Sequence, residues 1–312
     1  MTPDPSSTNR WCAPPRRGRT RFVAEVSSNF VRSGEERGEL ERALAFVDAA
    51  HALGCSAVKF QQFRIDALFA AAALERDPKL GARRAWELPE EFNAPLAERA
   101  RELGIDYAST PFYLEAVERL EPHVDYFKVA SYQLLWERLL VEVAQTRKPV
   151  ALSTGMATLS EVQRAVDVLW NAGCRDLLLM HCVSHYPTRP EEANLAAIGT
   201  MRGVFDTAMG WSDHSVDPGV VLRSVNRWGV EMVEFHLDLD GEGAEFDGGH
   251  CWLPHAIGPV IERCQKERRA SDMSPLDGSG RVRPRPSELE ERGWRTDPED
   301  GLRPLRETRA EW

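Results

Sequence analysis

The chain has 312 residues, of which 42% are hydrophobic and 28% charged, and its formal net charge is −10. The net negative charge argues against nucleic acid and against an anionic membrane surface as partners. No apolar run reaches the roughly 18 residues of a membrane helix, and the six cysteines form no C-x-x-C pair. The composition therefore predicts a cytoplasmic protein with reduced cysteines, long enough to bury a large core.

Short apolar runs alternate with segments of helical periodicity along most of the chain. Residues 1–20 precede this pattern as a polar, basic extension without the apolar stretch of a signal peptide. From residue 21 to 269 the apolar runs predict eight strands, at Phe22–Val26, Ala57–Gln61, Asp106–Ser109, Tyr126–Val129, Pro149–Ser153, Leu177–Cys182, Ala208–Trp211 and Val230–His236.

The segments between these strands predict helices. Thr158 and Glu161 have capping-box spacing at the start of one of them. Glycines follow the helical runs where left-handed C-caps are expected, at Gly54, Gly104, Gly173 and Gly229. Eight β-then-α units in about 245 residues match a (β/α)₈ TIM barrel in count and length. A doubly wound open sheet is the competing α/β fold, but no G-x-G-x-x-G follows the first predicted strand.

Two segments fall outside the alternation. Residues 64–88 form a long excursion after the second predicted strand, which in a barrel lies over the active-site face as a lid. Residues 270–312 are rich in charge, proline and glycine, which is typical of a mobile tail. Alternatively, Trp294, Leu302 and Leu305 anchor this tail on the barrel.

Polar side chains gather at the carboxyl ends of the predicted strands, which meet at one end of a barrel. Lys59 and Lys128 each interrupt an apolar run. Such lysines either snorkel or pair with a buried carboxylate, or they bind an anion. We interpret them as cations that hold a phosphate and a carboxylate. Hydroxyl groups would complete the cradle, at Ser109, Thr110, Ser131 and Ser153.

Two histidines also end strand-like runs, His214 and His236. They are either core residues or the ligands of one divalent metal ion, with positions left for water and substrate oxygens. Glu25 ends the first strand and is either an ion-pair partner of a lysine or a general base. This end of the barrel predicts metal-assisted chemistry on an anionic small molecule.

Other polar residues carry less weight. A lone histidine is more often structural or exposed, and His181, His185 and His250 are interpreted so. Tyr186 begins a loop that offers an aromatic wall. Asp247, in a glycine-rich segment, either contacts a polar substrate or is solvated.

An ordered series of short segments resembles the sialic acid synthase family, which condenses phosphoenolpyruvate with an amino-sugar aldehyde. The resemblance spans about residues 21–265. Its segments are Ala24-Glu25-Val26, Ala57-Val58-Lys59-Phe60-Gln61, Ser109-Thr110-Pro111-Phe112, Lys128-Val129-Ala130-Ser131, Leu152-Ser153-Thr154-Gly155-Met156, His181-Cys182-Val183-Ser184 with Tyr186-Pro187, and Ser212-Asp213-His214.

This resemblance implies a barrel, a homodimer, and a divalent cation, Mn²⁺ or Mg²⁺, on His214 and His236. The catalytic positions it implies are Glu25, Lys59, Lys128 and Gln133. The residues implied for phosphoenolpyruvate are Lys59, Thr110, Lys128, Ser131, Ser153 and Ser212. Those implied for the acceptor sugar are Gln61, Tyr186 and Asp247.

The sequence departs from the family pattern at four points. Glu-Lys-His-Phe becomes Glu234-Phe235-His236-Leu237, Ala-Ser-Gly-Glu becomes Ala130-Ser131-Tyr132-Gln133, and the His-Asn-Gly after Asn29 becomes Phe30-Val31-Arg32. No counterpart of the antifreeze-like C-terminal domain follows the predicted barrel. In the family that domain supplies an arginine to the acyl group of the sugar in the partner's active site.

Together these features predict an enzyme that makes a nonulosonic acid of sialic type and phosphate. One alternative is a synthase of a different nonulosonic or 3-deoxy sugar acid. The other is a catalytically weak barrel that binds sugar or phosphoenolpyruvate as a regulatory or scaffold subunit.

Overall fold

A computed structural model of the chain describes residues 11, 20–32, 36–266 and 274–312. Parallel strands in these ranges close into a barrel, because β1 pairs with both β2 and β8. The strands are β1 (Arg21–Glu25), β2 (Ala57–Gln62), β3 (Asp106–Pro111), β4 (Tyr126–Val129), β5 (Val150–Ser153), β6 (Leu177–His181), β7 (Ala208–Asp213) and β8 (Met232–Leu237), with a short β9 (Cys251–Trp252) beside β8. The predicted (β/α)₈ TIM barrel is confirmed.

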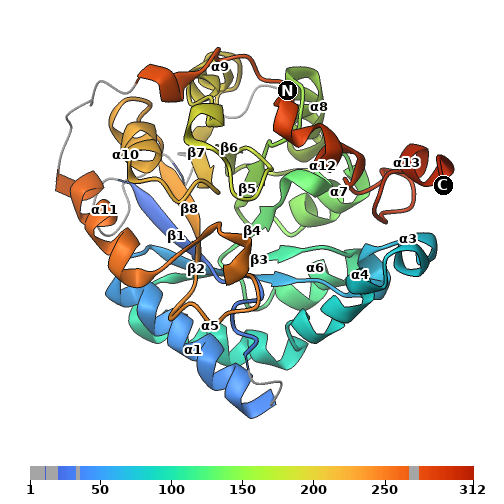
Figure 1. Cartoon of the computed structure of the whole chain (residues 1–312), viewed down its shortest axis with the longest axis horizontal. Coiled ribbons are helices and arrows are strands. Elements are labelled where there is room, and N and C mark those ends of the chain that lie inside the picture. Colours follow the sequence, from blue (N-terminus) through green and yellow to red (C-terminus); the bar gives the residue numbers. More distant parts are fainter. Residues whose placement is uncertain (1–10, 12–19, 33–35, 267–273) are drawn as a thin grey trace.

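A ring of helices surrounds the strands (Figure 1). In chain order they are α1 (Glu36–Ala52), α5 (Asn93–Leu103), α6 (Leu114–Leu120), α7 (Glu137–Gln145), α8 (Leu159–Asn171), α9 (Ala196–Val204), α10 (Pro218–Asn226) and α11 (Pro254–Lys266). The capping box of Thr158 and Glu161 starts α8 as predicted. Within the described ranges, no helix is both long and apolar enough to cross a membrane.

Apolar side chains fill the barrel below the carboxyl ends of its strands. This interior cluster comprises Trp11, Val23, Ala57, Ala108, Tyr126, Ala151, Leu178, Met180, Ala208 and Met232. Trp11 packs edge-on against Tyr126, with ring centroids 5.0 Å apart. Apart from Trp11 and Thr20, the predicted N-terminal extension lies outside the described residues. Because side chains fill the interior, the open space of the barrel lies at the carboxyl ends of its strands.

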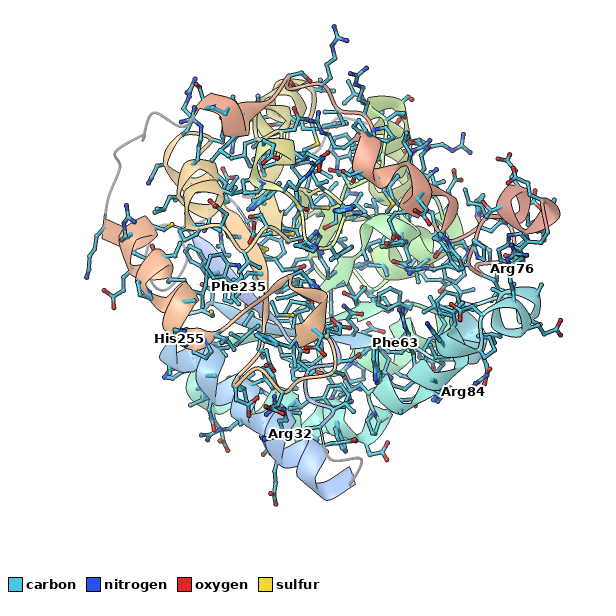
Figure 2. All side chains as sticks on the ribbon, viewed as in Figure 1. Arg32, Phe63, Arg76, Arg84, Phe235 and His255 are labelled. Carbon is cyan, nitrogen blue, oxygen red and sulfur yellow. The ribbon has the colours of Figure 1, made fainter. Side chains whose placement is uncertain are left out.

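The excursion after β2 folds into three short helices, α2 (Ile65–Leu68), α3 (Ala71–Arg76) and α4 (Pro78–Ala82). Their buried side chains form a cluster of their own with Phe63 and Phe112. Figure 2 shows Phe63 toward the middle of the molecule, whereas Arg76 and Arg84 lie at its edge. We call residues 63–88 the lid segment.

The tail, residues 274–312, packs on the barrel and on the lid segment. It includes α12 (Leu289–Gly293) and α13 (Arg306–Ala310), and Figure 1 shows α13 beside α3. Arg303 N donates to Leu68 O at 2.8 Å, and Ala70 N donates to Arg303 O at 2.9 Å. The ring of Trp294 lies 6.3 Å from that of Phe69, centroid to centroid. Backbone pairing therefore fixes the register of the tail against the lid segment.

Carboxylates fix the other side of the tail to the loops above β5 and β6. Glu288 Oε1 accepts from Met156 N at 2.9 Å and from Ser184 N at 2.7 Å. Glu161 Oε1 accepts from Arg292 at 2.8 Å and from Arg295 at 3.2 Å. The tail is thus held by buried, charge-assisted hydrogen bonds as well as by apolar contacts.

Glu161→Gln is expected to weaken this docking in a pH-dependent way. Burial opposes ionisation of Glu161, but Arg292, the Thr158 amide and Arg295 outweigh it and lower its pKa to about 2. A depressed carboxyl pKa stabilises the fold above the unfolded pKa of 4.5, and the stabilisation is lost as pH falls from there toward 2. The variant should lose roughly 2–3 kcal/mol of unfolding free energy at pH 7.

Thermal melts of wild type and variant from pH 7 to pH 2 check this expectation. The difference in melting temperature should shrink below pH 4.5 and vanish near pH 2. Glu137→Gln, which removes an exposed carboxylate paired with Arg164 on the neighbouring helix, is the matched control and should melt like wild type. A constant difference at all pH values would contradict the assigned ion pairs.

Candidate active site

One cavity of about 460 Å³ lies at the carboxyl ends of the strands. Side chains two residues apart in a strand face the same side of a sheet. The residues that follow a member of the apolar interior cluster by two positions, or by four on β7, therefore point into the cavity. They are Glu25 on β1, Lys59 on β2, Thr110 on β3, Lys128 on β4, Ser153 on β5, Ser212 on β7 and Glu234 on β8.

Glu234 lies between the two lysines. Its Oε1 is 3.0 Å from Lys128 Nζ and 3.7 Å from Lys59 Nζ, and it accepts from Ser212 Oγ at 3.4 Å. Lys59 also forms an ion pair with Glu25 and donates to Thr110 Oγ1 at 3.2 Å. All six side chains are buried. The sequence interpretation missed Glu234, although its position two residues before His236 places both on the inward face of β8.

Charge is balanced within this group. Burial lowers the pKa of Lys59 to about 7, and Glu234 opposes the shift. Burial alone would raise the pKa of Glu234, but Lys128 and Lys59 hold it below its ordinary value. Two lysines and two glutamates thus share a buried pocket, where charge interactions are strong. An anionic ligand could displace the carboxylates from the ammonium groups.

Hydroxyl groups line the wall beside the lysines. Ser131 Oγ accepts from Gly155 N at 2.9 Å and lies 3.1 Å from Cys182 Sγ. A Cβ on Gly155 would come within 2.9 Å of Ser131 Oγ, so only glycine permits this approach. Ser153 Oγ is buried and has no hydrogen-bond partner among the described residues. Such an unpaired hydroxyl is available to a ligand oxygen.

His214 and His236 line the same cavity, with ring centroids 5.5 Å apart. His214 Nδ1 lies 2.8 Å from Val183 O, which leaves Nε2 free. Burial lowers the pKa of His214 to about 3 and that of His236 well below its ordinary value. His236 Nδ1 is buried without a partner in the described part of the chain. Neutral imidazoles with a free nitrogen suit a divalent metal ion.

The acceptor positions implied by the resemblance are only partly in the cavity. Gln61 lines it and donates from Nε2 to Glu25 Oε1 at 3.1 Å. Tyr186 also lines it, with its ring 4.3 Å from that of His214. Asp247 does not line it, and its contact with the acceptor stays a prediction. It is exposed on the loop after β8, and Glu245 lines the cavity from the same loop.

Gln133 does not line the cavity either, and its catalytic role stays a prediction. It lies in a short 3₁₀ turn after β4 and is fully buried. Its Nε2 donates to Thr296 Oγ1 at 3.2 Å, so its amide contacts the tail.

The sequence interpretation gave little weight to His181 and His250. Only one of these two histidines lines the cavity. His181 Nε2 lies 2.9 Å from Ala193 O, outside the cavity, and is structural. His250 lines the cavity, with its ring 4.7 Å from that of His236. Burial opposes its protonation, but Cys251 and Glu245 raise its pKa to about 10. Glu245 thus places a carboxylate within 4 Å of both His236 and His250 on that side of the cavity.

Arg303 of the tail forms part of the cavity wall. Its guanidinium lies 4.2 Å from the ring centroid of Tyr132 and 5.2 Å from that of Phe112. Nε donates to Thr296 Oγ1 at 3.2 Å, while Nη2 is buried without a partner among the described residues. Burial lowers its pKa to about 10. No sequence pattern marked this residue, because it lies outside the βα repeat.

The fold and this cavity define a (β/α)₈ barrel protein with a buried, charge-lined site. The sequence model of the NeuB family matches residues 46–273. An uncharacterized protein of Methanocaldococcus jannaschii is 38% identical over 70% of this chain and 65% of its own length. The spore coat polysaccharide biosynthesis protein SpsE of Bacillus subtilis is 32% identical over 73% of this chain and 64% of its own length.

Solved structures agree with the sequence matches. The crystal structure of SpsE superposes with a TM-score of 0.76 at 28% identity, covering 91% of this chain and 78% of that one. The N-acetylneuraminic acid synthetase of Leptospira borgpetersenii superposes with a TM-score of 0.70 at 27% identity, covering 87% and 90%. This chain belongs to the NeuB family. It spans slightly less than two thirds of the length of the M. jannaschii protein and SpsE.

Proposed function

We propose that the chain condenses phosphoenolpyruvate with an open-chain amino-sugar aldehyde to give a nonulosonic acid and phosphate. The observation that carries the proposal is the convergence of Lys59, Lys128, His214 and His236 on one buried cavity. Relatives are named N,N'-diacetyllegionaminic acid synthase, pseudaminic acid synthase and N-acetylneuraminate-9-phosphate synthase. Their names support a sugar acceptor and leave several acyl-amino sugars as candidates.

The lysine side of the cavity suits phosphoenolpyruvate. Two ammonium groups match its two anionic groups, and charge-assisted hydrogen bonds to Lys59 and Lys128 would replace those to Glu25 and Glu234. The hydroxyls of Thr110, Ser131, Ser153 and Ser212 line the same wall. Binding would thus free a carboxylate close to the reacting carbon.

The histidine side suits the aldehyde. His214 and His236 would hold a divalent cation, Mn²⁺ or Mg²⁺, and when bound this ion supplies a Lewis acid for the aldehyde oxygen. Tyr186 and Gln61 are near enough to orient the sugar chain. Arg303, on the wall formed by the tail, offers its free Nη2 to a carbonyl oxygen of the acceptor.

The reaction then needs few protein groups. The methylene carbon of phosphoenolpyruvate bonds to the aldehyde carbon, and over the whole reaction the aldehyde oxygen gains the proton that water gives up. Water adds to the enol carbon, and Glu25, released from Lys59, accepts its proton. The bond between that carbon and the phosphate oxygen breaks, so one phosphoenolpyruvate, one aldehyde and one water give one acid and one phosphate. Lys59 and Lys128 stabilise the charge that develops on the phosphate.

Phosphate release tests the proposal. The purified protein is incubated with phosphoenolpyruvate, Mn²⁺ and a panel of N-acylated hexosamines, including N-acetylmannosamine. We expect phosphate release that depends on one acceptor, with a matching nonulosonic acid detected by mass spectrometry. Binding of phosphoenolpyruvate without phosphate release from any acceptor would instead favour a regulatory or scaffold role.

A further inference from the structure

The strand β9 brings a thiol next to the histidines of the cavity. In the parallel pairing of β8 with β9, His236 and Cys251 are register partners. His250 directly precedes Cys251 in the sequence. One donor atom from each of His236, His250 and Cys251 lies within 4.8 Å of the others, and in the described ranges no other group of three or more His, Cys, Asp or Glu residues is brought together in this way.

All three side chains are buried, and the two histidines are incompletely hydrogen-bonded. His236 and His250 are each 8% exposed and Cys251 is 6% exposed. Nδ1 of both histidines is buried without a partner among the residues that the structure describes. A buried polar atom left without a partner costs about 1–3 kcal/mol. Two such atoms beside one thiol leave nitrogen lone pairs and a sulfur available to a ligand.

Neighbouring groups favour a cation there. Glu245 Oε2 lies 3.8 Å from His236 Nδ1 and 3.7 Å from His250 Nε2, too far for a hydrogen bond to either. Asn29 Nδ2 lies 3.3 Å from Cys251 Sγ and can donate to a thiolate. Small side-chain rotations would bring the three donors to the roughly 3.3–3.8 Å spacing set by zinc bonds of about 2.0–2.3 Å.

We propose that His236, His250 and Cys251 form a site for a thiophilic divalent ion such as Zn²⁺, with Glu245 at its edge. A thiolate among two imidazoles selects Zn²⁺ or Co²⁺ over Mg²⁺ and Mn²⁺, which prefer oxygen ligands. The site shares His236 with the pair His214 and His236 but includes a ligand type that the pair lacks. The inference does not depend on the proposed condensation, because ion binding is measured without substrates.

Cobalt spectroscopy of the full chain tests the site. Co²⁺ is added to the metal-free protein, and a near-ultraviolet absorption from thiolate-to-cobalt charge transfer reports a sulfur ligand. We expect this absorption in wild type, its abolition by an equivalent of Zn²⁺, and its persistence in excess Mn²⁺. Wild-type protein that binds Co²⁺ without this absorption would overturn the proposal.

Variants identify the sulfur. Cys251→Ser should abolish the absorption and weaken Zn²⁺ binding by roughly a hundredfold or more, since even residues that only support metal ligands cost 10–100-fold. Cys264→Ser, on α11, and Cys182→Ser, on the lysine side of the cavity, should keep it. Loss of the absorption in Cys182→Ser and not in Cys251→Ser would refute the assignment.

A second variant covers the case in which Cys251→Ser does not fold, as judged by circular dichroism. His250→Gln should then weaken Zn²⁺ binding to the same extent, and unchanged binding would refute the site.

Discussion

Lys128→Met is expected to lower kcat/KM for phosphoenolpyruvate about a thousandfold, on the scale of losing one preorganised charge in a dry site. Lys128 Nζ is buried, and Glu234 is the carboxylate within 3.0 Å of it. Lys59 cannot replace it, because in the proposed complex Lys59 already holds the other anionic group of phosphoenolpyruvate. The variant should also lose calorimetrically detectable binding of phosphoenolpyruvate at concentrations that saturate wild type.

Two controls separate lost binding from lost folding. Lys148→Met removes a lysine that donates to Val124 O at 2.6 Å, just before β5 at the opposite end of the barrel, and should leave turnover unchanged. Circular dichroism should show a folded Lys128→Met protein, since methionine retains the apolar stem of the side chain. Wild-type affinity for phosphoenolpyruvate in that variant would remove Lys128 from the donor site.

Arg303→Ala is expected to raise KM for the acceptor sugar about 10- to 100-fold, while KM for phosphoenolpyruvate changes little. A hydrogen bond to a charged group contributes about 1.5–3 kcal/mol, and the free Nη2 of Arg303 would make such a bond to the acceptor. Among the described residues, the ion pairs and hydrogen bonds of Lys59 and Lys128 are made to barrel strands, so donor binding should persist. Initial rates measured at varied concentrations of each substrate separate the two KM values.

Arg306→Ala is the matched control for this prediction. Arg306 is also on the tail, but it is exposed and pairs with Glu299 and Asp300. It should keep wild-type kinetics. Equal KM increases for both substrates in Arg303→Ala, or a melting temperature well below that of wild type, would indicate that the arginine only holds the tail in place.

Most of the barrel could be predicted from the sequence, because its signals are local. Each strand is a short apolar run, and each helix carries its own periodicity and cap, such as Thr158 and Glu161 at α8. The pairing of β1 with β8, which closes the barrel, follows from the number of units and from no single residue. The ends of the strands differ from the prediction by a few residues because hydrogen bonding, and not apolar character, sets them.

The inward half of the site was predictable for the same reason. Lys59, Lys128 and His236 are polar residues in strands, and the alternation of strand side chains places them in the cavity. The same rule applied to β8 would have identified Glu234. No such rule predicts which loop and tail residues face the cavity. Asp247 is exposed on the loop after β8, and the register of the tail on the lid segment selects Arg303.

The contribution of Arg303 to the cavity wall has a consequence for biosynthesis. The eight βα units, through Lys266, are synthesised before Arg303, so the wall beside Phe112 and Tyr132 is still missing at that stage. Translation must continue past Arg303 before this wall of the cavity exists. Closure of the cavity wall is therefore a late event in biosynthesis, which follows the docking of residues 274–312.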